Sequence, residues 1–132
     1  MIKEVKRQIS ELPKNIRIGQ QNKHIAGTHE YNQYVKSQKA KGEYGPSRLN
    51  GDIEYAQELV NKYSGKGIPD ISLKGKWLNA EIIKTDEVIG IVVNNLNGIE
   101  KETTNFKIHY GENGTHIVPD YPSKKGANNE KN

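Results

Sequence analysis

Two histidines and a lysine alternate with apolar residues in KIHYGENGTHIVPDYP, residues 107–122. If residues 111–114 form a four-residue hairpin loop, His109 faces His116 across the two strands, with Cβ atoms about 5 Å apart. Side chains alternate between the two faces of a strand, so Lys107 lies on the same face as both histidines. The opposite face takes the apolar side chains that we expect in the core: Phe106, Ile108 and Ile117.

This arrangement suits proton transfer at a phosphate. Cleaving RNA without a metal needs a base for the 2′ proton, an acid for the leaving 5′ oxygen and a cation for the phosphorane charge. Histidine has a reference pKa of about 6.5, and one positioned acid or base accelerates a reaction about 10²- to 10⁴-fold. Lysine suits the phosphate. In the alternative interpretation, the histidines are only neighbours on a solvated sheet face.

The other two histidines, His24 and His29, lie close together in NKHIAGTHEY. Lys23, Thr28 and Tyr31 add a charge, a hydroxyl group and an aromatic ring, a mixture that suits a nucleotide better than a core. The alternative is a surface loop. Four histidines could bind zinc, but this H-x4-H pair lies outside any HExxH helix, and the chain has no cysteine. We therefore expect no metal and no cofactor.

Helices are predicted before the hairpin. Apolar residues at helical spacing precede Pro13, which indicates a short amphipathic helix that is either a packing element or a linker. Residues 14–50 lack a sustained period, so we expect mostly loop with one helical turn near residues 31–36. An apolar stripe over residues 53–63 predicts a helix that Asn50 or Asp52 caps and that ends before Gly65.

Short apolar runs separated by turn residues follow the second predicted helix. They predict strands at residues 69–73, 77–83, 88–94, 103–110 and 115–119. The short connections favour an antiparallel meander. The fold class is therefore α+β, with N-terminal helices followed by an antiparallel β-sheet of four to five strands.

The chain has 132 residues, about the size of one domain, and its net charge of +4 is unevenly distributed. Residues 1–50 carry 10 Lys and Arg against 4 Asp and Glu, whereas residues 51–106 carry 6 against 9. The basic ends can attract a polyanion such as RNA, or simply keep the protein soluble. We expect no export signal and no membrane span. The expected organisation is a helix or linker at 1–19, a domain at 20–122 and a disordered polar tail at 123–132.

Four segments resemble the polymorphic toxin type 50 domain: KHIAGTHEY, AQELVNKYSGKG, GIVVNNLNGIEKETTNFKIHY and GTHIVPDYPSKKG. This domain occurs at the C-termini of bacterial toxins and of phage head-morphogenesis or minor capsid proteins. The resemblance covers about residues 20–126. It implies a metal-independent RNase of the superfamily of barnase, EndoU enzymes, colicins D and E5 and RelE toxins, with a four-stranded antiparallel sheet. It also points to specific site residues: His24, Lys107, Thr115 and His116.

Hairpin and resemblance together predict an endoribonuclease that forms a 2′,3′-cyclic phosphate by transesterification. We expect His24 and His116 to be the acid and base, in either order, and His109 to orient its neighbour or share the proton transfer. Lys107 would stabilise the phosphorane, and Thr115 would hydrogen-bond the phosphate. The residues expected to bind substrate are Lys23, Thr28, Tyr31 and Tyr110, where either tyrosine could stack on a base.

The expected partners are an RNA substrate, a cognate immunity protein and, in a phage context, capsid proteins. The expected place of action is the cytoplasm of the target or host bacterium, or a virion. Two other functions compete with catalysis. A phage head-morphogenesis accessory would bind nucleic acid in a salt-dependent way without forming products. A protein-interaction module would use the histidine face to bind a partner protein.

Overall fold

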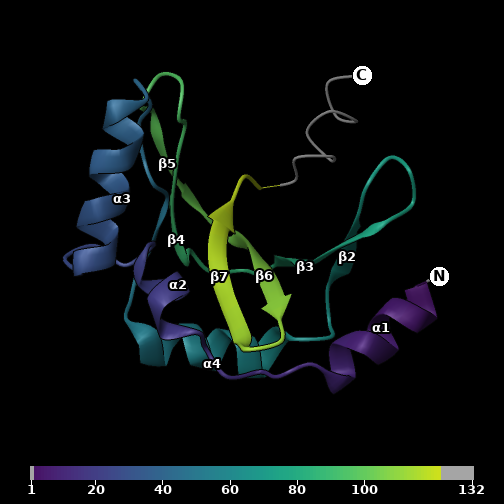
Figure 1. Ribbon diagram of the computed structural model, residues 1–132. Helices are drawn as coiled ribbons and strands as arrows, with labels where there is room; N and C mark the ends of the chain where they lie inside the picture. Colours follow the sequence, from purple (N-terminus) through teal and green to yellow (C-terminus); the bar gives the residue numbers. More distant parts are fainter. Residues whose placement is uncertain (1, 123–132) are drawn as a thin grey trace.

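Helices and two antiparallel sheets make up the computed structural model, which describes residues 2–122 (Figure 1). The helices are α1 (Ile2–Glu11), α2 (Ile18–Asn22), α3 (His29–Ala40) and α4 (Ile53–Tyr63). The larger sheet has the order β2-β3-β6-β7, with strands Ile68–Ile71, Trp77–Lys84, Asn105–Gly111 and Gly114–Asp120. The smaller sheet has the order β1-β4-β5, with strands Arg48–Leu49, Gly90–Val93 and Glu100–Thr103. The predicted α+β class is confirmed.

Two helices form where their apolar spacing predicted them. Helix α1 ends before Pro13, and its side chains Val5 and Ile9 are buried in the core, so this helix is a packing element. Helix α4 begins after Asp52, whose carboxylate accepts a hydrogen bond from the backbone N–H of Tyr55 at 3.0 Å. This cap satisfies one of the free N–H groups at the helix start.

The helical turn expected near residues 31–36 is present, but residues 14–50 contain more helix than the sequence predicted. The segment contains α2 and the twelve-residue helix α3, of which only Gln38 is buried. A helix that buries so little needs no apolar stripe. Helix α3 therefore lacks the apolar residues at helical spacing from which a helix is predicted. The cap is present instead, because the Thr28 side chain accepts a hydrogen bond from the N–H of Tyr31 at 3.1 Å.

The predicted meander is interrupted by a separate hairpin. Strands β4 and β5 pair with each other, and β4 pairs with β1, while β3 pairs directly with β6. Most of the strand predicted at residues 103–110 is β6 of the larger sheet, and only Thr103 belongs to β5 of the smaller sheet. Thr103 ends β5 and anchors this junction, because its hydroxyl donates to the backbone oxygen of Asp120 at 2.6 Å. The chain then enters β6 at Asn105.

The core lies against one face of the larger sheet. Phe106, Ile108 and Ile117 are fully buried there, as the strand alternation predicts. They belong to the same apolar cluster as residues of α4, namely Ala56, Leu59 and Val60. Burying a large apolar side chain contributes roughly 1.5–3 kcal/mol each, so this face stabilises the sheet that carries the hairpin. Within residues 2–122, none of the helices has the length and apolar character to cross a membrane. The predicted tail at 123–132 lies outside the described residues.

Candidate active site

The β6–β7 hairpin has the predicted register. His109 pairs with His116, and Lys107 pairs with Val118. The two imidazole rings are stacked, with centroids 4.9 Å apart and planes 14° from parallel. Both side chains are half-buried on the face of the sheet that points away from the core. The hairpin therefore places two imidazoles side by side, where they can act on one group.

A chain segment far away in sequence runs along the outer edge of β7. The N–H of Thr115 donates to the backbone oxygen of Asn15 at 2.8 Å. The N–H of Arg17 in turn donates to the backbone oxygen of Thr115 at 2.7 Å. Gly114 permits this approach: its φ is +127°, and a Cβ atom there would lie 2.6 Å from the Asn15 oxygen. The segment thus occupies the edge of the strand and leads directly into α2.

Gln21 of α2 fixes the position of that helix. Its side-chain Nε2 donates to the backbone oxygen of Ile117 at 3.0 Å, and its Oε1 accepts from the Ile117 N–H at 2.6 Å. The amide is fully buried and replaces a neighbouring strand at this point of β7. Since Ile117 follows His116 directly, this pair of bonds sets where the chain after α2 lies relative to the hairpin.

His24 follows α2 and extends the stack to three rings. Its ring is nearly parallel to that of His116, at 7°, with centroids 6.4 Å apart. The edge of Tyr34 packs against it from α3, at 5.8 Å and 82°. His24 Nδ1 lies 2.8 Å from the backbone oxygen of Ser47. A carbonyl can only accept, so Nδ1 carries the proton, and in the neutral ring Nε2 is left as the basic nitrogen.

Burial, together with nearby positive charge, lowers the pKa of all three imidazoles. Burial lowers the pKa of His24, against the effect of the Ser47 hydrogen bond. Burial, together with the charges of Lys107 and His24, lowers the pKa of His109. The pKa of His116, in the middle of the stack, falls to about 3 because of burial and of both neighbouring histidines. A proton on one ring therefore disfavours a proton on the next.

One of the cations near the stack, Lys107, is already held in an ion pair. Lys107 Nζ lies 2.8 Å from a carboxylate oxygen of Asp70, and both side chains are largely buried. The sequence does not predict this ion pair. The Asp70 carboxylate partly neutralises the positive charge of Lys107. Lys23 and Arg17 are close enough for their charges to lower the pKa of His116. They place positive charge near the middle of the stack.

Two predicted site residues point away from the histidines. Tyr110 and Thr115 pair with each other across the hairpin, one position from the histidine pair, so their side chains lie on the core face. Thr115 is fully buried, and its hydroxyl donates to the backbone oxygen of Asn15 at 3.4 Å. The Tyr110 hydroxyl donates to a carboxylate oxygen of Glu81 at 2.7 Å, and burial raises its pKa. The structure brings neither residue to the face of the sheet that carries the histidines.

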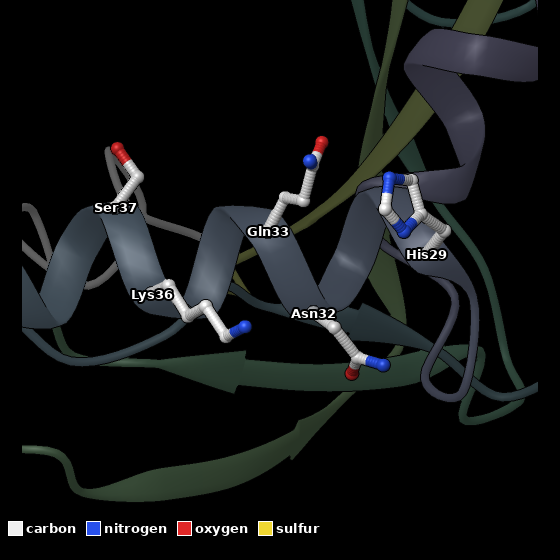
Figure 2. Close-up of a pocket in the computed structure, with 5 residues that line it drawn as sticks. All are labelled: His29, Asn32, Gln33, Lys36 and Ser37. Carbon is white, nitrogen blue, oxygen red and sulfur yellow. The ribbon is translucent and has the colours of Figure 1, made fainter.

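The other predicted residues are distributed along α3 and its start. Thr28 caps the helix, and its hydroxyl donates to the backbone oxygen of Asn22 at 2.7 Å. Tyr31 lines a small hollow that Arg48 also lines. His29 lies on an exposed hollow along α3 (Figure 2), and within residues 2–122 it makes no ring contact with the three stacked histidines.

The site contains residues that carried no sequence signal. Gln21, Ser47, Arg17 and Asp70 act through contacts with residues more than twenty positions away. None of them belongs to a motif, and single polar residues in loops are common. Only the polar character of Gln21 inside α2, next to a histidine predicted as functional, could have drawn attention to it.

The three stacked rings do not form a chelating group. Imidazole lone pairs lie in the ring plane, so nearly parallel stacked rings hold them in separate planes that do not meet at one point. Within residues 2–122, no group of three or more His, Cys, Asp or Glu residues has a metal-binding arrangement. The arrangement is suited to proton transfer and anion binding.

A scan against family models matches residues 16–119 to the family described as bacterial toxin 50. The match spans most of the chain and includes the stacked histidines and the elements that position them. The chain therefore belongs to the bacterial toxin 50 family, which indicates a toxin-type function. Among curated proteins, no relative matches this chain.

Proposed function

We propose that this domain is a metal-independent endoribonuclease. The observation that carries the proposal is the stack of His24, His116 and His109, with centroid separations of 6.4 and 4.9 Å. Transesterification needs one basic and one acidic group at the same phosphate. In a stack of interacting imidazoles, a proton on one ring disfavours protonation of the next, so one ring can be the acid while a neutral ring is the base. Membership in a bacterial toxin family supports a damaging activity of this kind.

In the proposed reaction, Nε2 of His24 takes the proton of a ribose 2′ hydroxyl, and the 2′ oxygen attacks the adjacent phosphorus. The bond from phosphorus to the 5′ oxygen breaks, and protonated His116 gives its proton to that oxygen. The products are a 2′,3′-cyclic phosphate and a 5′ hydroxyl. The Ser47 hydrogen bond supports His24 as the base, because it leaves Nε2 unprotonated in the neutral ring.

His116 must gain a proton before it can act as the acid. Its pKa of about 3 applies to the protein without substrate. A bound phosphate anion within about 4–6 Å favours the protonated form and raises this pKa. His109, stacked on His116, can hold or pass on the same proton. Substrate binding would therefore charge the stack, and the acid would form only where RNA is bound.

Lys23 and Arg17 are the cations that we assign to the phosphorane, because their charges already act on His116. We assign Lys107 and Asp70 a positioning role beside His109, since their charges act on the pKa of that ring in opposite directions. We propose no phosphate contact for Thr115, which faces the core.

The test is incubation of the purified protein with RNA in excess EDTA, followed by analysis of the product ends. We expect 2′,3′-cyclic phosphates and 5′ hydroxyls. An oligonucleotide with a 2′-deoxyribose at a mapped cut site should resist cleavage at that bond, since the nucleophile is missing. Cleavage of the deoxy bond, or activity only with added metal, would overturn the mechanism. Salt-dependent binding without products would support a nucleic-acid-binding function instead.

This proposal also defines the biological setting. A toxin domain that cleaves RNA acts in the cytoplasm of the target bacterium, and the cell that produces it needs a cognate immunity protein. The half-buried face that carries His109 and His116 is the surface that such a protein would have to block.

A further inference from the structure

A hollow of about 220 Å³ continues from the histidine stack. His24 lines it, and its other walls come from α3, from residues 44–47 and from β4. Val118, two residues after His116 on the same face of β7, also lines it, so the hollow adjoins the stack directly. At about 30 Å³ per water, the hollow holds roughly seven waters, which is room for one flat nucleobase but not for a whole nucleotide.

Tyr44 lines this hollow and is an exposed aromatic residue. The residue is 53% exposed, although hydrogen bonds hold its backbone on both sides. Its N–H donates to the backbone oxygen of Asn95 at 2.9 Å, and its backbone oxygen accepts from Gln38 Nε2 at 2.8 Å. The ring packs over Gly98, where a Cβ atom would lie 2.8 Å from Tyr44 Cδ1. The aromatic ring of an exposed residue with an anchored backbone can serve as a stacking surface for a base.

Polar groups around the hollow can read a base edge. The side-chain amide of Asn95 is exposed at its rim and offers both a donor and an acceptor. Ser47 connects the hollow to the stack, because its hydroxyl accepts from the N–H of Val93 at 3.0 Å while its carbonyl accepts from His24. Ser47 therefore positions His24, the proposed general base, and also holds one wall of the hollow in place.

From this geometry, we infer that the hollow is a nucleobase subsite. It would take the base of a nucleotide next to the cleaved phosphate, stacked on Tyr44 and hydrogen-bonded to Asn95. This inference rests on the proposed function, since the phosphate at the stack determines which base reaches the hollow. It makes the domain selective for bases at the cut site, in addition to binding the RNA backbone.

The test compares nucleoside 3′-monophosphates with inorganic phosphate by NMR titration of the ¹⁵N-labelled protein. We expect phosphate to shift signals of the three stacked histidines, Lys23 and Arg17, and to leave those of Tyr44 and Asn95 unchanged. A nucleotide should also shift Tyr44, Ser47 and Asn95, with an affinity that differs among the four bases. Identical shifts from phosphate and from all four nucleotides would overturn the subsite.

Matched variants separate stacking from folding. Tyr44→Leu removes the aromatic face and should weaken nucleotide binding about 5- to 150-fold, whereas Tyr44→Phe should stay within about twofold of wild type. Asn95→Ala should reduce the difference among bases without changing phosphate binding. Thermal melts check that each variant folds. Unchanged nucleotide affinity in folded Tyr44→Leu contradicts the inference.

The titration does not depend on cleavage, so the two proposals can fail separately. If wild type cuts RNA but no nucleotide shifts the hollow, the subsite is wrong and the active site stands. If nucleotides fill the hollow but wild type cuts no RNA, the subsite is supported as a nucleotide site and the catalytic proposal fails.

Discussion

Gln21→Met tests whether one side-chain amide holds the site together. Methionine has nearly the same shape as glutamine but can neither donate to the Ile117 carbonyl nor accept from the Ile117 N–H in the same way. The wild-type bonds are 3.0 and 2.6 Å long and buried. Each buried backbone group that loses its partner costs about 1–3 kcal/mol. We therefore expect the free energy of unfolding to fall by about 2–6 kcal/mol for the two groups, a large share of the 5–15 kcal/mol typical of a domain.

Urea denaturation measured by fluorescence of Trp77, the single tryptophan, provides the assay. Its indole is half-buried and donates to the backbone oxygen of Ala80 at 2.9 Å, so it reports on the larger sheet. The matched control is Gln20→Met, because the Gln20 side chain makes no hydrogen bond within residues 2–122. A loss below about 1 kcal/mol for Gln21→Met, or equal losses for both variants, would refute the anchoring role.

Two further predictions concern protonation and the core face. The three stacked histidines have lowered folded pKa values. Between about pH 6.5 and 3 the unfolded chain therefore binds more protons, and the protein loses stability as the pH falls. His116→Asn should reduce this slope by up to about 1.4 kcal/mol per pH unit in urea titrations, and an unchanged slope would show that His116 titrates normally. Tyr110→Phe should lower the free energy of unfolding by about 1–3 kcal/mol, because buried Glu81 loses a donor, while RNA cleavage stays within about twofold of wild type. A cleavage rate that falls more than tenfold in the folded variant would place Tyr110 at the substrate after all.

The histidine pair could be predicted from the sequence because strand alternation and a short turn fix the register. The same alternation also places Tyr110 and Thr115 on the core face with Phe106, and only the family resemblance drew Thr115 into the site. Local pattern was therefore the better guide at this position. The physical reason is that a one-residue step along a strand always changes the face.

The third ring of the stack could not be derived from local pattern. His24 reaches His116 because the Gln21 amide bonds to a strand 96 residues further along the chain. No periodicity encodes such a contact. The full length of helix α3 was missed for a related reason: it buries only Gln38, so its sequence lacks an apolar stripe. The hollow beside His24 depends on both features and on the separate β4–β5 hairpin, and it was equally hidden from sequence patterns.

Single-turnover cleavage of RNA in excess EDTA by four alanine variants tests the central claim most directly. His24, His109 and His116 belong to the stack, while His29 lies on the outer side of α3 and provides a matched control (Figure 2). We predict that His24→Ala and His116→Ala each lower the rate about 10²- to 10⁴-fold, that His109→Ala has a smaller effect, and that His29→Ala resembles wild type. Wild-type rates for folded His24→Ala and His116→Ala would show that the stack is not the active site.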